Sequence, residues 1–134
     1  YGTSPTIDHR VALAAGPAGE GFISANFAHL WNSDAPAAVH YREICAKYEV
    51  PEAYMGMYHF YGYLTAKVLV EGLERAGKKP TRKRLIKGLE TLKNWDSGGF
   101  PPITYNSIDH AGNESVILVQ IKDGVQTVIT DWID

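Results

Sequence analysis

The chain has 134 residues, of which 45% are hydrophobic and 21% are charged. This composition provides enough apolar material for a packed core and excludes an intrinsically disordered chain. Lys and Arg number 13 against 15 Asp and Glu, which gives a formal net charge of −2. Because nucleic-acid-binding domains carry a strong basic excess, this balance argues against a nucleic-acid partner.

Cys45 is the only cysteine, so no intramolecular disulfide can form. A lone cysteine at helical spacing is typically a small buried hydrophobe, and no local base would activate it as a nucleophile. No apolar run approaches the roughly 20 residues that a membrane-spanning helix needs. The first residues lack the features of a signal peptide, which an exported protein would already have lost, so they leave the localisation open.

The first third of the chain predicts one strand and one helix. Residues 1–19 show no clear element and end in glycine-rich sequence. Residues 21–27 form an apolar run between turn residues, which predicts a strand. Helical spacing of the larger side chains predicts a helix over residues 35–48, with Asp34 as its N-cap.

The middle of the chain carries the strongest helical pattern. Apolar residues recur at i, i+3, i+4 and i+7 from Tyr61 to Ala76, which predicts a long amphipathic helix. We expect this helix to begin between residues 52 and 58 and to end at Gly77. Thr81 can cap the next helix, whose apolar face consists of Leu85, Ile86, Leu89 and Leu92.

The last third of the chain is expected to be extended. Residues 103–105 predict a short strand, and residues 115–121 a nearly continuous apolar strand of the kind that is covered on both faces. Asp123 and Gly124 form a hairpin turn signal, followed by a returning strand over 125–133. The predicted class is therefore α/β, with helices packed on a sheet and a C-terminal β-hairpin.

The sequence contains no recognisable catalytic or metal-binding motif. The five histidines show no spacing typical of zinc ligands. The chain also lacks the G-x-S-x-G nucleophile motif and the glycine-rich loops that cradle phosphate. We therefore expect no enzymatic activity, no metal and no cofactor.

A basic run occupies residues 78–84. Such a run is usually a solvated surface, although a partner surface is an alternative. Basic side chains in the first turn of a helix oppose the helix dipole, so they do not stabilise the helix. The run also lacks the interleaved aromatic residues typical of nucleic-acid binding.

An aromatic cluster lies near the expected start of the long helix. Its members fall within residues 54–63 and are Tyr54, Met55, Met57, Tyr58, His59, Phe60, Tyr61 and Tyr63. One helical face cannot bury all of them. They are either ordinary core and surface residues or the lining of a small-molecule cleft, which combines apolar area with a few polar groups.

Three stretches together resemble the branched-chain amino-acid-binding (LivJ/LivK-like) family of type I periplasmic solute-binding proteins. Residues 20–23 resemble the Glu-Gly step that opens a strand in the family's second lobe. Residues 62–77 resemble its "GYDA…vLaeALerAG" helix, with Leu64 in place of the usual Asp, and residues 82–92 resemble the helix that follows. Residues 99–124 resemble its "GxixF…dHxg…v.lvqvkdG" ending.

The resemblance implies two α/β lobes that close on a ligand. Residues 1–134 would then be a C-terminal fragment of one periplasmic-binding-protein domain that contributes to both lobes, without a separate second domain. The helices over 61–76 and 82–92 would belong to the first lobe, and the tail would return to the second. Because the apolar faces would need further segments or a second copy, we expect dimerisation or domain exchange of the isolated fragment.

The resemblance also implies a function. It predicts an extracytoplasmic, periplasmic receptor of an ABC importer, with a small-molecule ligand and an ABC permease as its partners. The ligand would be an amino acid of the branched-chain type or a related small carboxylate. Two alternatives stay open, namely an aromatic-acid receptor, suggested by the aromatic cluster, and a ligand-sensing regulatory protein of the same fold.

Four residues are candidates for ligand binding. Glu20 matches the position where amino-acid-binding members place a carboxylate near the ligand ammonium, although it could serve only to open the strand. Tyr58 falls near the helix start, where members line the pocket for the ligand side chain, and His59 and Tyr61 are its neighbours. An amine ligand would need Glu20, whereas an aromatic acid would need stacking aromatics and a cationic or amide clamp.

Overall fold

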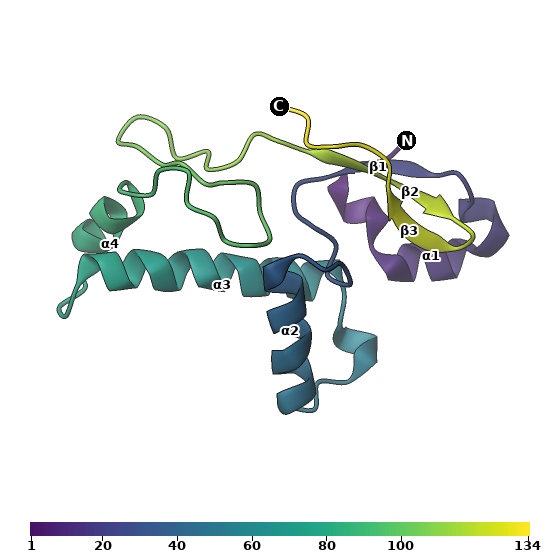
Figure 1. Cartoon of the computed structure of the whole chain (residues 1–134), viewed down its shortest axis with the longest axis horizontal. Coiled ribbons are helices and arrows are strands. Elements are labelled where there is room, and N and C mark those ends of the chain that lie inside the picture. Colours follow the sequence, from purple (N-terminus) through teal and green to yellow (C-terminus); the bar gives the residue numbers. More distant parts are fainter.

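The computed structural model describes residues 1–134, apart from the side chain of Pro5. Its helices are α1 (His9–Ala15), α2 (Pro36–Lys47), α3 (Met57–Ala76) and α4 (Arg82–Leu89), and its strands are β1 (Ile23–Asn26), β2 (Ile117–Lys122) and β3 (Val125–Val128). The sheet and α1 lie at one end of the molecule, α4 lies at the other end, and α3 runs between them (Figure 1). The expected mixture of helices and a sheet with a C-terminal hairpin is confirmed.

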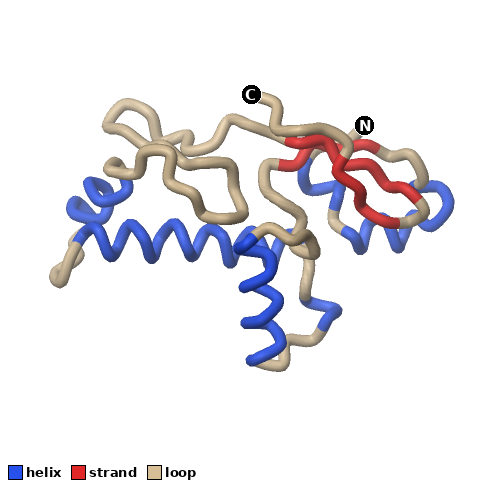
Figure 2. The backbone as a smooth tube through the Cα atoms, in the orientation of Figure 1, coloured by secondary structure: helices blue, strands red, loops and turns tan.

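The sheet is antiparallel, with β2 between β1 and β3 (Figure 2). Asn26 at the end of β1 pairs with Ile117 at the start of β2. Along β2, buried side chains alternate with partly exposed ones. The two faces of β2 are therefore unequally covered, in contrast to the strand covered on both faces that its composition predicts.

The hairpin turn forms where the sequence predicts it. Asp123 and Gly124 have φ angles of 52° and 74°, the left-handed conformation that a tight two-residue hairpin turn needs. The returning strand is shorter than expected, because β3 ends at Val128, beyond which Ile133 forms an isolated bridge with Val116.

The largest departure from the sequence prediction is α1, which occupies part of residues 1–19 where no element is expected. Asp8 caps this helix by accepting a hydrogen bond from the backbone N–H of Arg10 at 3.0 Å. The helix has seven residues, of which only Ala12 is buried. A stretch this short and small shows no helical period in the sequence.

Two other elements differ in detail. The predicted helix over 35–48 is confirmed as α2, but its N-cap is Ala35 and not Asp34. The strand expected over 103–105 is reduced to a single bridge between Ile103 and Trp95 inside a long loop.

The contact between α3 and α4 depends on two glycines. The helix α3 ends, as predicted, at Gly77, whose φ is 78°, and Thr81 caps α4 by accepting from the backbone N–H of Arg84 at 3.3 Å. A Cβ atom on Gly88 of α4 would lie 2.6 Å from the carbonyl oxygen of Gly72 in α3. The two helices can therefore approach this closely only because neither position carries a side chain.

Buried apolar residues form two clusters. The sheet cluster contains Ile7, Ala12, Leu30, Met57, Ile117, Val119 and Ile121. The helix cluster contains Ala28, Ala37, Ala38, Tyr41, Cys45, Phe60 and Leu64, so the lone cysteine is the buried hydrophobe that its spacing predicts. Tyr61 packs against both clusters and thus lies between them.

Part of the apolar face of α3 is uncovered. Leu69, Val70 and Leu73 are 46%, 52% and 37% exposed. Such a face is typical of a surface that packs against a further segment or partner. The expected dimerisation or domain exchange across this face stays a prediction.

We predict that Gly88→Ala lowers the free energy of unfolding by about 1–3 kcal/mol, because the new methyl group would force α3 and α4 apart. Gly62→Ala is the matched control, since a Cβ at this position in the interior of α3 meets no atom within 4 Å. This control should raise stability by about 0.5–1 kcal/mol. Urea denaturation measures both changes, and equal effects of the two substitutions would contradict the close helix contact.

Candidate functional site

Polar side chains meet where the end of β1, residues 4–10 and the start of α3 come together. Asn26 is wholly buried, and its side-chain oxygen accepts a hydrogen bond from the hydroxyl of Tyr61. The hydroxyl groups of Ser4 and Tyr61 are 3.0 Å apart, and Nδ2 of Asn26 donates to the carbonyl of Ala28 at 2.7 Å. We refer to this group as the junction cluster, which comprises Ser4, Asp8, Arg10, Asn26, Tyr58 and Tyr61.

A single carboxylate within the junction cluster caps two helices. Asp8 is 1% exposed, and its Oδ2 accepts a hydrogen bond from the backbone N–H of Met57 at 3.2 Å, at the start of α3. Its Oδ1 lies 2.6 Å from Nε of Arg10 and also caps α1. Burial alone would raise the pKa of Asp8, but the hydrogen bonds and the charge of Arg10 outweigh it and lower that pKa below 3.8.

Tyr58 and Tyr61 lie one helical turn apart on the same side of α3. The guanidinium of Arg10 lies 6.0 Å from the ring centre of Tyr58, and the ring of Tyr61 stacks on Phe27 at 4.4 Å. Burial raises the pKa of Tyr61 to about 12, and the charges of Tyr58 and Asp8 act in the same direction. The ring contacts thus join this side of α3 to Arg10 and to Phe27, the residue that follows β1.

Two buried nitrogen atoms lie beside the junction cluster without a hydrogen-bond partner among the described residues. They are Nδ1 of His9 and Nε1 of Trp31, whose ring centres are 5.6 Å apart. The nearest carboxylate oxygen of Asp8 is 3.6 Å from Nδ1 of His9, beyond hydrogen-bonding range. Because buried polar atoms are normally paired, these two are available to a bound polar group.

The structure separates the four candidate residues into three places. Tyr58 and Tyr61 join the junction cluster, whereas Nδ1 of His59 lies 2.7 Å from the hydroxyl of Tyr41 on the side facing α2. Glu20 lies at the hairpin, where its carboxylate accepts from the backbone N–H of Asp123 at 3.1 Å and of Gly124 at 3.3 Å. Ligand-binding roles for these residues stay predictions.

Glu20 and the junction cluster lie at opposite ends of β2. Asn26 pairs with Ile117 at the start of that strand, and the turn that Glu20 holds follows its last residue, Lys122. A ligand that contacted both groups within this part of the chain would have to span the strand.

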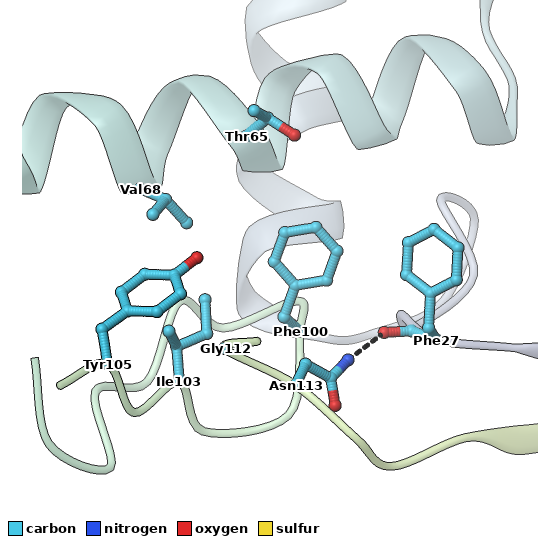
Figure 3. A pocket seen from close by; sticks show the side chains of 8 residues that line it. All are labelled: Phe27, Thr65, Val68, Phe100, Ile103, Tyr105, Gly112 and Asn113. Carbon is cyan, nitrogen blue, oxygen red and sulfur yellow. Dashed lines mark hydrogen bonds between the residues drawn. The ribbon is translucent and has the colours of Figure 1, made fainter. Parts of the chain in front are cut away.

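A cavity of about 380 Å³ opens between α3 and the loop before β2 (Figure 3). Its lining consists of Phe27, Thr65, Val68, Phe100, Ile103, Tyr105, Gly112 and Asn113. The side chain of Asn113 closes one side by donating to the carbonyl of Phe27 at 3.0 Å. None of the four candidates lines the cavity, although Phe27 connects it to Tyr61 through their stacked rings.

Leu64 illustrates how this chain departs from the motif that it resembles. Its side chain is wholly buried in the helix cluster, where an Asp would place an unpaired carboxylate among apolar groups. Leucine at this position therefore removes a hydrogen-bonding group and supports the core.

Ser4, Asp8 and Arg10 are not among the candidates that the sequence indicates, because they lie in a segment without a clear pattern of helix or strand. An Asp that precedes a short helical stretch is an N-cap signal and could have indicated Asp8. Its second partner, Met57, lies 49 residues later and has no local signature. Within the described part of the chain, no three His, Cys, Asp or Glu side chains gather as a metal site, and no helix could cross a membrane.

We predict that Asp8 makes stability depend on pH in the acidic range. Because its folded pKa is below the unfolded value near 3.8, its contribution is complete above that value and is lost as the pH falls through the folded pKa. Asp8→Asn should therefore lower the free energy of unfolding at neutral pH. Below about pH 4, the free energy of unfolding of this variant should fall less steeply than that of the unmodified protein. Urea denaturation between neutral and strongly acidic pH checks this, and parallel curves for the two proteins would contradict it.

Comparison with known proteins places these observations in a family. A family model described as periplasmic binding protein matches residues 2–126. The fold is similar to a branched chain amino acid ABC transporter from Thermus thermophilus with bound valine, with a TM-score of 0.85 and 23% identity over 93% of this chain and 36% of that one. No curated protein matches the sequence.

Two further solved structures share the fold. One is a possible leucine/isoleucine/valine-binding protein from Rhodopirellula baltica, with a TM-score of 0.79 and 22% identity over 90% of this chain and 32% of that one. The other is an ABC transporter substrate binding protein from Aeropyrum pernix, with a TM-score of 0.79 and 17% identity over 97% of this chain and 36% of that one. The chain thus spans about a third of the length of these proteins. The match over residues 2–126 shows that the chain belongs to the periplasmic binding protein family, the family that its motifs resemble.

Proposed function

We propose that the protein carrying this chain is an extracytoplasmic solute receptor of an ABC importer. It binds a small molecule, presents it to a permease and catalyses no reaction. Membership in the periplasmic binding protein family supports this proposal, as does the fold shared with ABC transporter binding proteins. In this account the chain contributes to both lobes, with the sheet cluster in one lobe and α3 with α4 in the other.

The junction cluster is the proposed place where this chain contacts the ligand. The observation that carries this proposal is the pair of buried nitrogens of His9 and Trp31, which lack partners among the described residues beside the start of α3. Tyr58 is 51% exposed and adds apolar area beside Arg10, the residue that follows His9. Apolar surface with a few converging polar groups is typical of a small-molecule site. The boundary between two lobes is also where hinge closure would bury a ligand.

The ligand is proposed to be an amino acid of the branched-chain type or a related small carboxylate. The names of two proteins with the same fold, one with bound valine, support this choice. In this proposal Glu20 would have to leave the hairpin amides in order to pair with the ligand ammonium. Otherwise the ammonium would need a carboxylate from outside this chain.

One observation favours the alternative of an aromatic acid. The buried carboxylate of the junction cluster, Asp8, is already paired with Arg10, so it is a poor partner for an ammonium group. The rings of Tyr58, Trp31 and Phe27 lie around the same region, as their contacts with Arg10, His9 and Tyr61 show. This arrangement suits a planar ligand that lacks an amine.

A thermal-shift screen of the purified protein against amino acids and aromatic carboxylates tests the proposal. A ligand at 100 times its Kd stabilises the folded state by about 2.7 kcal/mol, which raises the melting temperature by several degrees. Tyr58→Ala should reduce this shift, whereas Tyr54→Ala, at a more exposed tyrosine outside the junction cluster, should preserve it.

Glu20→Gln separates the two ligand classes, with Glu114→Gln as its exposed control. A shift with leucine-like amino acids that Glu20→Gln abolishes would support the amino-acid receptor and the role of Glu20. A shift only with aromatic carboxylates that is unchanged in Glu20→Gln would contradict the amino-acid receptor and support the aromatic-acid receptor. The absence of a shift with every solute would contradict the receptor proposal.

A further inference from the structure

The charges of this chain are strongly segregated. Residues 75–87 contain seven of the 13 basic residues and no Asp or Glu, so this segment carries +7. All remaining residues together carry six basic and 15 acidic side chains, or −9. The modest net charge of −2 thus hides two regions of opposite sign.

The structure gathers the positive region at one end of the molecule. It forms the basic tip, which we define as the basic side chains of residues 75–87 at the turn between α3 and α4. This turn lies at the end of α3 remote from the sheet (Figure 1). The tip residues other than Arg75 are Lys78, Lys79, Arg82, Lys83, Arg84 and Lys87, and all six are exposed.

Little within the described residues neutralises the basic tip. Arg75 pairs with Glu71 at 2.7 Å, and this is the only tip residue in an ion pair there. Arg84 donates to the carbonyl of Lys79 at 3.1 Å, which orients its guanidinium without cancelling its charge. The tip therefore presents at least six uncompensated cations to its surroundings.

The basic charges do not serve the fold of α4. Arg82, Lys83 and Arg84 occupy its first turn, where the helix dipole favours acidic side chains. A first turn with three cations and no acid is electrostatically unfavourable for the helix. The charge of the tip thus destabilises the start of α4, and such a local loss of stability is expected of a surface that serves binding.

A hollow of about 470 Å³ lies within this region. Arg75, Arg84 and Lys87 line it together with Ala76, Gly88 and Thr91. Arg84 and Lys87, which make no ion pair among the described residues, are suited to a phosphate group, which Arg and Lys bind through charge-assisted hydrogen bonds.

We propose that the basic tip binds the phosphate headgroups of an anionic membrane surface. Residues 75–91 contain no aromatic residue, and Ile86 is the only one of their large apolar side chains that is exposed, so the cations do not surround a sizeable apolar centre. A specific protein interface usually has such a centre, whereas a diffuse anionic surface requires only clustered positive charge. Because the remainder of the chain carries −9, the same field repels it, so the molecule approaches the membrane tip first.

Sedimentation of the purified protein with lipid vesicles tests this proposal. The protein should bind phosphatidylglycerol vesicles at low ionic strength, leave phosphatidylcholine vesicles unbound, and dissociate as salt screens the charges. Lys78→Gln/Lys83→Gln should bind about 30-fold more weakly, which corresponds to about 1 kcal/mol per lysine at an anionic surface. Lys47→Gln/Lys122→Gln removes the same charge from exposed positions outside the tip and should bind like the unmodified protein.

The outcome separates the tip from general charge effects and from other partners. Equal weakening in the two double variants, with unchanged melting temperatures, would overturn the assignment to the tip. No binding to phosphatidylglycerol vesicles at low ionic strength would overturn the membrane assignment and favour an acidic protein surface as the partner. Neither result depends on which solute the receptor binds.

Discussion

The hydrogen bond between the hydroxyl of Tyr61 and the buried side-chain oxygen of Asn26 is the contact on which the arrangement of the molecule depends. It joins the end of β1 to the first turns of α3, and Tyr61 packs against the sheet cluster and the helix cluster at the same point. Asp8 adds a second link by capping both α1 and α3. Such polar contacts fix geometry because a buried group without its partner costs free energy.

Elements with local signals could be predicted from the sequence. The apolar period and Gly77 define α3, and the residues Asp123 and Gly124 define the hairpin, because each pattern acts within a few residues. The helix α1 has no helical period in the sequence, because it is only seven residues long and buries only Ala12.

In the candidate site, too, the sequence predicts what depends on neighbouring residues but not what depends on residues far apart in the chain. Tyr58 and Tyr61 are three residues apart and therefore lie on one side of α3. His59 is two residues from Tyr61 and therefore points to another side, toward Tyr41. Glu20 could not be placed from the sequence, because its partners at the hairpin follow about a hundred residues later. Charge segregation, by contrast, is visible in the sequence, but only the fold shows that the basic residues form one end of the molecule.

Amide hydrogen exchange with and without a solute that raises the melting temperature tests the central claim most directly, namely that ligand binds at the junction cluster. The account predicts slower exchange in residues 4–10, 26–31 and 57–61 on binding, because closure around the ligand suppresses local opening there. Exchange at the hairpin over 120–126 should change little. Protection confined to the hairpin, or to the cavity residues over 100–113, would contradict the claim.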